Sequence, residues 1–228
     1  RENIASQFDQ IAFRAPEEDS SSHRQFLHAW QSGFGADQWT DILRRENCPD
    51  AANVARHLAQ FAHAPATQQV DAIAGERMLR FVPALLSEVI QTAMPAVAIE
   101  RALSVLESVL RRSAYISLLN ENHAALARLV DLCARSRYIA EQLARHPVLL
   151  DELLDPNILT GEVTKQQLEF ELRQRLDLSD ADDSEARILI ISQFQRAAMF
   201  RIAVADFNGA LPIMKVSDGL TWLAEVVL

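Results

Sequence analysis

Between Arg101 and Pro156 the sequence reads as a run of short amphipathic helices with tight joints. Apolar residues recur there at the i, i+3 and i+4 spacing of a helix face. The chain has only 6 glycines in 228 residues, although 49% of its residues are hydrophobic. Such low glycine usage disfavours a turn-rich β fold, and the abundant Leu, Ala, Glu, Gln and Arg are strong helix formers. We therefore predict an all-α fold, an irregular bundle of about a dozen short to medium helices without a sheet.

Polar residues placed before apolar periods mark the expected helix starts, because their side chains can accept hydrogen bonds from the first free amides. The predicted starts are Ser22, Asp50, Thr67, Thr164, Ser184 and Ser217. A further helix is expected at residues 2–13. The Gly33-Phe34-Gly35 segment and Gly209 are predicted helix ends, since glycine readily adopts a left-handed conformation. The helix from Ser184 is the longest, and we expect Ile188, Ile191, Phe194 and Ile202 on its buried face.

Three prolines shape the predicted joints. Pro83 falls inside an apolar helical pattern, which predicts a kink or two abutting helices. Pro95 is well placed in the first turn of the next helix. Pro147 restricts the preceding residue, so His146 is expected to leave the helical region and form a joint.

Charge and cysteine content bound the class of protein. The formal charge of −9 and the isoelectric point near 5.2 argue against a nucleic-acid surface. Cys48 and Cys133 belong to no CxxC pair, which predicts buried thiols in a reducing cytoplasm. No apolar run is expected to approach the roughly 20 residues of a bilayer span. Helical patterns reach both ends of the chain, at Arg1 and Leu228, so we expect the polypeptide to continue beyond them.

The acidic segment Asp180-Ala181-Asp182-Asp183 superficially resembles a D-x-D magnesium pair. Such a pair needs a strand and a nearby glycine turn that grips phosphate. The nearest upstream glycine, Gly161, precedes Glu162, and the flanking patterns are helical. We interpret the segment as a solvated helix N-terminus, where acids complement the helix dipole.

The histidines do not have the spacing of a zinc pair on a helix. His23 and His28 are five residues apart, and His57 and His63 are six apart, whereas a helix-borne pair needs i, i+4. No catalytic, cofactor-binding or metal-binding residue is therefore predicted in this chain.

Two arginine clusters are the basic spots of interest, and their role is left open. Arginine suits bidentate carboxylate or phosphate binding, so a domain contact or an effector site is one reading. The favoured reading is simple ion pairing with nearby acids. The arginines are Arg111, Arg112, Arg135 and Arg137, and the acids are Glu107, Glu121, Asp131 and Glu141.

Several segments together resemble a known family. They are Arg111–Tyr115, Ser136–Ala140, His146–Leu154, Leu211–Asp218 and Leu220–Glu225. Their sequences are similar to the helical middle of the bifunctional enzyme that adenylylates and deadenylylates bacterial glutamine synthetase. The resemblance implies that residues 1–13 end the adenylyl-removing half and residues 14–66 form a variable helical linker. It further implies a central helical bundle at 67–160, and a long helix at 161–228 that leads into the adenylyltransferase half.

The resemblance also implies a function for the parent enzyme. Such enzymes contain two nucleotidyltransferase domains, of which one adds AMP from ATP to a tyrosine of glutamine synthetase and the other removes it by phosphorolysis. Magnesium serves the chemistry, and PII proteins and glutamine govern the balance. The catalytic motifs of both domains are absent from this sequence, so the implied role is a non-catalytic connector in nitrogen regulation, with no cofactor of its own.

Two alternatives remain open at this point. The chain could be a stand-alone all-α adaptor that binds a partner protein in a groove. It could also be a complete all-α enzyme whose site the motifs do not reveal.

Overall fold

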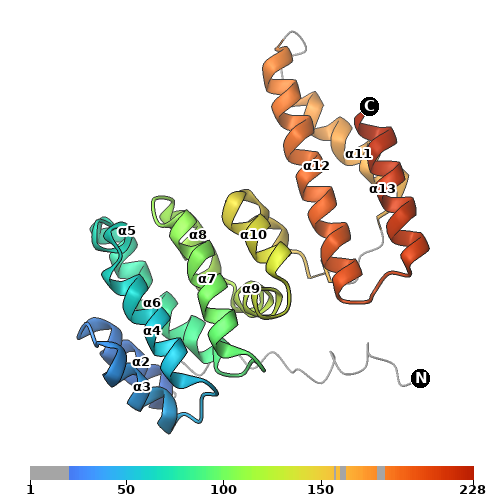
Figure 1. Ribbon diagram of the computed structural model, residues 1–228. Coiled ribbons are helices and arrows are strands. Elements are labelled where there is room, and N and C mark those ends of the chain that lie inside the picture. Colours follow the sequence, from blue (N-terminus) through green and yellow to red (C-terminus); the bar gives the residue numbers. More distant parts are fainter. Residues whose placement is uncertain (1–20, 157, 160–162, 179–182) are drawn as a thin grey trace. The chain divides into compact units, whose positions relative to one another are not determined.

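The structure is a computed structural model that describes residues 21–156, 158–159, 163–178 and 183–228 (Figure 1). Within these ranges the regular elements are helices and no strand is present, which confirms the predicted all-α class. The helix expected at residues 2–13 and the acidic residues Asp180 and Asp182 lie outside the described residues. The chain divides into two compact units, and the boundary falls between Arg145 and His146.

Unit 1, which ends at Arg145, contains nine of the described helices. They are α2 (Ser21–Gln31), α3 (Ala36–Arg45), α4 (Ala51–His63), α5 (Pro65–Gln68), α6 (Ala72–Val89), α7 (Pro95–Val109), α8 (Ser113–Glu121), α9 (His123–Arg135) and α10 (Arg137–Arg145). Two helices organise the packing, because α6 contacts α2, α8 and α9 while α7 contacts α4, α9 and α10. Both carry a broad apolar face, and Phe81, Leu85, Ile99 and Leu106 are almost fully buried between their neighbours.

Unit 2, which begins at His146, is smaller. It contains the 3₁₀ helix η1 (Pro147–Leu154), α11 (Lys165–Asp177), α12 (Ser184–Phe207) and α13 (Ile213–Val227). The three α-helices contact one another, and η1 packs against α12 (Figure 1). Their shared core consists of Leu168, Leu172, Phe194, Ala198, Ile202 and Leu223.

Several predicted caps are confirmed. The Thr164 hydroxyl accepts a hydrogen bond from the Gln167 amide at 3.3 Å, and α11 follows directly. The long helix α12 begins at Ser184, with the Asp183 carboxylate accepting from the Ala186 amide at 2.9 Å. Gly33 and Gly209 have positive φ angles of 63° and 67° just past the ends of α2 and α12, as their predicted roles require.

Other predicted starts are wrong. Ser22 lies inside α2, and its hydroxyl donates to Glu46, the residue just after α3, at 2.6 Å instead of capping. Ser217 lies inside α13, because Pro212 fixes a start one turn earlier. The pattern from Thr67 is divided between α5 and α6, since the Asp71 carboxylate accepts from the Ala74 amide and starts α6 there. Asp50 does precede α4, but its carboxylate makes no cap hydrogen bond.

The prolines behave differently from one another. The helix α6 is continuous from Ala72 to Val89, so Pro83 does not divide it into two. Pro95 opens α7 as predicted. His146, with φ −131° and ψ 75°, has left the helical region, and the joint that it forms with Pro147 is the boundary between the two units.

The helix α12 departs from expectation in two respects. Ile188 is 64% exposed, because the first turns of α12 extend past the core: no residue of this helix before Phe194 is buried. Phe194 and Ile202 are buried as predicted, and Ile191 is partly buried against the same core.

In addition, α12 is long and apolar enough, by length and composition alone, to cross a membrane. By this measure the expectation that no run approaches that length is wrong, since residues 188–205 contain only two charged residues, Arg196 and Arg201, beside the polar Ser192, Gln193 and Gln195.

Candidate functional site

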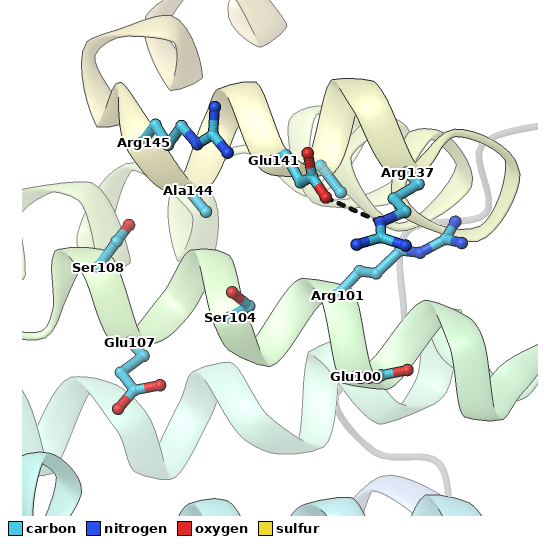
Figure 2. Close-up of a pocket in the computed structure, with 10 residues that line it drawn as sticks. Glu100, Arg101, Ser104, Glu107, Ser108, Arg137, Glu141, Ala144 and Arg145 are labelled. Carbon is cyan, nitrogen blue, oxygen red and sulfur yellow. Dashed lines mark hydrogen bonds and ion pairs between the residues drawn. The ribbon is translucent and has the colours of Figure 1, made fainter.

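A groove with a volume of about 740 Å³ runs between α7 and α10 in unit 1 (Figure 2). Its lining residues recur along each helix at intervals of three and four positions, so each set lies on one helix face. They are Glu100, Arg101, Ser104, Glu107 and Ser108 of α7 and Arg137, Ala140, Glu141, Ala144 and Arg145 of α10. The small side chains leave the space between the helices, and the charged ones border it.

The arginine Arg101 has a structural role at one end of the groove. Its Nη1 donates to the carbonyl oxygens of Cys133 at 2.8 Å and Ala134 at 3.4 Å. These carbonyls belong to the last turn of α9, whose final carbonyls have no partner within the helix. Arg101 therefore connects α7 to the C-terminal end of α9.

The charges that border the groove are balanced, with three arginines and three glutamates. Arg137 Nε donates to Glu141 Oε1 at 2.8 Å (Figure 2), and this hydrogen bond lowers the pKa of Glu141. Ser108 donates its hydroxyl to the carbonyl of Val105 within its own helix at 2.6 Å. These contacts provide charged and polar recognition groups, and none of them activates a serine as a nucleophile.

The two arginine clusters are in different situations. In the second cluster, Arg135 Nη1 lies 3.0 Å from Asp131 and Arg137 pairs with Glu141. Ion pairing with nearby acids, the favoured interpretation, is thus confirmed for these two residues. Arg111 and Arg112 are exposed at the joint between α7 and α8.

The histidines and cysteines do not gather into a site. His63 Nδ1 contacts the carbonyl of Ala59 on its own helix, and His28 packs edge-on against Phe34.

Burial raises the pKa of Cys133 to about 12 and that of Cys48 to about 11, so both thiols are free, buried and protonated. In the described part of the chain no three His, Cys, Asp or Glu residues are placed to hold a metal ion.

Unit 2 contains an ion network, here called the Arg201 network, that consists of Arg201, Glu152, Glu171 and Arg175. Arg201 Nη2 on α12 lies 2.6 Å from Glu171 on α11, and its Nη1 lies 3.6 Å from Glu152 on η1. Arg175 Nη2 also contacts Glu171 at 2.6 Å. One guanidinium group thus connects three separate elements of unit 2.

The Arg201 network is largely shielded from water. The side chains of Arg201, Glu152 and Glu171 are only 16–27% exposed. Burial, the dominant effect, raises the pKa of Glu152 even though Arg201 opposes it. Arg175 also lies 5.7 Å above the ring of Phe194, which joins the charged network to the apolar core.

Sequence reasoning did not find this network. Glu171 and Arg175 have the i, i+4 spacing of a helix pair, and that part of the signal was visible. Arg201 is 30 residues from Glu171, however, and only the packing of α11 against α12 brings the two together. An arginine in an otherwise apolar helix is the one hint that the sequence contained.

The chain is similar in sequence to known proteins. Residues 126–228 match the family model of glutamate-ammonia ligase adenylyltransferase. Three relatives are each described as a bifunctional glutamine synthetase adenylyltransferase/adenylyl-removing enzyme. The one from Pseudomonas aeruginosa is 37% identical over 93% of this chain and 22% of its own length.

The other two give the same picture. The relative from Pseudomonas syringae pv. tomato is 38% identical over 90% of this chain and 21% of its own length. The relative from Pseudomonas putida is 43% identical over 82% of this chain and 19% of its own length. The chain thus spans about a fifth of the length of these relatives, and over most of its own length it matches bifunctional glutamine synthetase adenylyltransferase/adenylyl-removing enzymes.

Proposed function

We propose that the chain is a non-catalytic helical connector of an enzyme of this family, which positions and couples two nucleotidyltransferase domains. The observation that carries the proposal is the Arg201 network, in which one partly buried guanidinium group contacts acids of η1 and α11 from α12. Coupling between distant sites requires a packed element whose arrangement both sites can bias. An element held by a few shielded ion pairs suits this role, because small movements change their energies strongly.

The parent enzyme, in this proposal, acts on glutamine synthetase in the cytoplasm and responds to PII and glutamine. ATP and magnesium would be bound by the flanking nucleotidyltransferase domains, and the present chain would contribute no catalytic group. The names of the relatives support the substrate and the two activities. Residues 1–13, 14–66, 67–160 and 161–228 remain the proposed division between the preceding half, the linker, the central bundle and the following half.

The non-catalytic part of the proposal is tested with the isolated chain. Incubated with glutamine synthetase, magnesium and radiolabelled ATP, it should transfer no AMP, and it should remove none from adenylylated glutamine synthetase. Transfer that disappears in the double variant Asp180→Asn, Asp182→Asn would contradict the proposal and assign catalysis to the acidic segment.

The coupling part is tested in the full-length enzyme with Ile202→Val. Ile202 is 2% exposed in the core of unit 2, so removing one methylene group should cost about 0.5–1.5 kcal/mol of stability there. Both activities without effectors should stay within about twofold of wild type, while the response to PII or glutamine weakens. Ile73→Val, the same change at a 60% exposed position of α6, is the matched control.

The outcome has a clear alternative. If Ile202→Val lowers both activities equally under every condition and leaves the response to effectors unchanged, the segment is a passive scaffold and the coupling role is wrong.

A further inference from the structure

A second, smaller pocket lies in unit 1 among α2, α3, α4, α5 and α6, and it shares no lining residue with the α7–α10 groove. Its volume is about 220 Å³. Trp39, Met78 and Thr67 contribute buried surface to it, and Trp30 and Phe34 contribute partly exposed surface. None of its ten lining residues carries a charge. A site of this composition favours an uncharged, apolar group over a phosphate, a carboxylate or an ammonium group.

The aromatic rings that line the pocket are held in place by other rings. Trp30 stacks on Phe61 with centroids 6.3 Å apart, and Trp39 packs at 6.4 Å from Phe26. The third ring, Phe34, is fixed edge-on by a histidine of α2 at 5.8 Å. Because these side chains are already restrained, a ligand that enters would lose little free energy to ordering them.

One residue that lines the pocket, Thr67, has a buried hydroxyl without a hydrogen-bond partner among the described residues. Thr67 is only 7% exposed, and its buried Oγ1 makes no hydrogen bond to any residue that the structure describes. A buried hydroxyl without a partner costs about 1–3 kcal/mol, so a ligand that pairs with it recovers this cost. The neutral aromatic walls and the single unpaired hydroxyl therefore point to the same kind of ligand.

We propose that this pocket binds an uncharged aromatic ring of the size of phenol or indole, with one polar atom that pairs with the Thr67 hydroxyl. An apolar cavity of about 150 Å³ accepts benzene, whereas drug-sized ligands occupy about 300–1,000 Å³. A volume of about 220 Å³ thus suits one or two fused rings. The ring belongs either to a free small molecule or to a side chain such as tyrosine.

Two glycines provide a way to close the pocket without disturbing its walls. A Cβ atom added at Gly33 or Gly75 would meet no atom within 4 Å. Gly33 has a positive φ angle, so a side chain there would be strained, but Gly75 lies within α6 and tolerates one. Gly75→Met should therefore fold normally and fill the space that the ring would occupy. Glu76→Met, at the adjacent exposed position, is the matched control.

The test is fluorine NMR of the whole chain labelled with 5-fluorotryptophan. Of the three tryptophans, Trp30 and Trp39 line the pocket and Trp222 lies on α13 in unit 2. Titration with phenol should shift the first two resonances to saturation in the millimolar range and leave that of Trp222 unchanged. Cyclohexanol, which has the hydroxyl and the ring size but no aromatic character, should bind at least several-fold more weakly.

The variants separate the proposed contacts. Thr67→Val should raise the melting temperature of the free protein, because it removes the unpaired hydroxyl, and should weaken phenol binding about three- to tenfold. Gly75→Met should abolish the shifts, whereas Glu76→Met should retain them. N-acetyltyrosinamide, titrated in parallel, identifies the source of the ring, and binding of either compound supports the pocket assignment.

Three results would overturn the proposal. They are unsaturable or absent shifts of Trp30 and Trp39 with both compounds, equal binding of cyclohexanol and phenol, and unchanged phenol binding in Thr67→Val. Loss of binding in Gly75→Met counts in favour only if its circular dichroism spectrum and melting temperature match those of Glu76→Met.

Discussion

The two units are stabilised in different ways. Unit 1 buries large apolar side chains along two central helices, α6 and α7, and ion pairs such as Arg137–Glu141 lie on its surface. In unit 2 six buried residues of α11, α12 and α13 form one core cluster beside the shielded Arg201 network, and the start of α12 leaves Ile188 and Leu189 more than half exposed. The fraction of the unfolded chain's surface that is buried on folding rises with domain size. The smaller unit is therefore stabilised less by apolar burial.

This difference indicates where regulation could act. A large apolar core responds little to pH or salt, whereas shielded ion pairs depend on charge state and geometry. We therefore expect unit 1 to behave as the rigid part and unit 2 as the responsive part. The following predictions test that contrast, starting with the largest expected effect.

Matched core truncations should have unequal consequences in the two units. Leu223→Ala in unit 2 and Leu106→Ala in unit 1 each remove a side chain that is at most 3% exposed, at a cost of about 2–5 kcal/mol. We expect the smaller unit to have the smaller free energy of unfolding. Leu223→Ala should therefore unfold unit 2 at 25 °C, while Leu106→Ala leaves unit 1 folded. Hydrogen exchange followed by mass spectrometry measures both. Equal loss of protection in the two variants would remove the distinction.

Breaking the Arg201 network should destabilise unit 2 alone. Arg201→Met leaves Glu152 and Glu171 shielded without a full counter-charge, which should cost about 2–3 kcal/mol after allowance for their partial exposure. Urea unfolding monitored by Trp222 fluorescence reports this loss in unit 2. The control Arg137→Met breaks an exposed pair in unit 1 and should change no unfolding midpoint. A normal midpoint for Arg201→Met would mean that the network contributes little.

The pH dependence of Glu152 has a defined sign. Burial raises its folded-state pKa above the ordinary value of 4.5, so the folded protein holds the proton more tightly than the unfolded chain does. The resulting stabilisation is present below pH 4.5 and is lost as pH rises through the raised pKa. Glu152→Gln cannot ionise, so its stability relative to wild type should improve from pH 4 to pH 7, by no more than about 1 kcal/mol. Unfolding midpoints across this range provide the measurement, and the opposite trend would show that Arg201 outweighs burial.

Thiol labelling should report on unit 1 without disturbing it. Cys48 and Cys133 both lie in unit 1, and their raised pKa values, about 11 and 12, keep almost no thiolate at pH 8. A thiol-reactive dye should thus modify neither cysteine in the folded chain. In Leu223→Ala the protection should persist although unit 2 is unfolded. Rapid labelling in that variant would show that the two units unfold together.

The fold class was predictable from the sequence because helical periodicity and capping are local properties. Thr164, Ser184 and Gly209 lie where the local pattern places them, although the residue that caps α12 is Asp183. Ser217 was misassigned because a proline five residues earlier starts the helix sooner. The burial of Ile188 was misjudged because a local apolar pattern does not show where a long helix extends past its core, and no residue of α12 before Phe194 is buried.

The sites were far less accessible to sequence reasoning. The Arg201 network joins three elements that meet only through packing, and the aromatic pocket combines residues of five helices. The Gly33-Phe34-Gly35 segment was correctly predicted as a turn, yet its contribution of Phe34 to a pocket depends on where α5 and α6 lie. Local patterns contain no information about such tertiary neighbours.

The most direct test of the central claim is hydrogen exchange of the full-length enzyme with and without PII or glutamine, resolved for these two units. Amides of η1, α11 and α12 around Arg201 should change protection when an effector binds, and the core amides of α6 and α7 should not. If both activities respond to the effector while every amide of unit 2 keeps its protection, unit 2 is not the responsive element and the account is wrong.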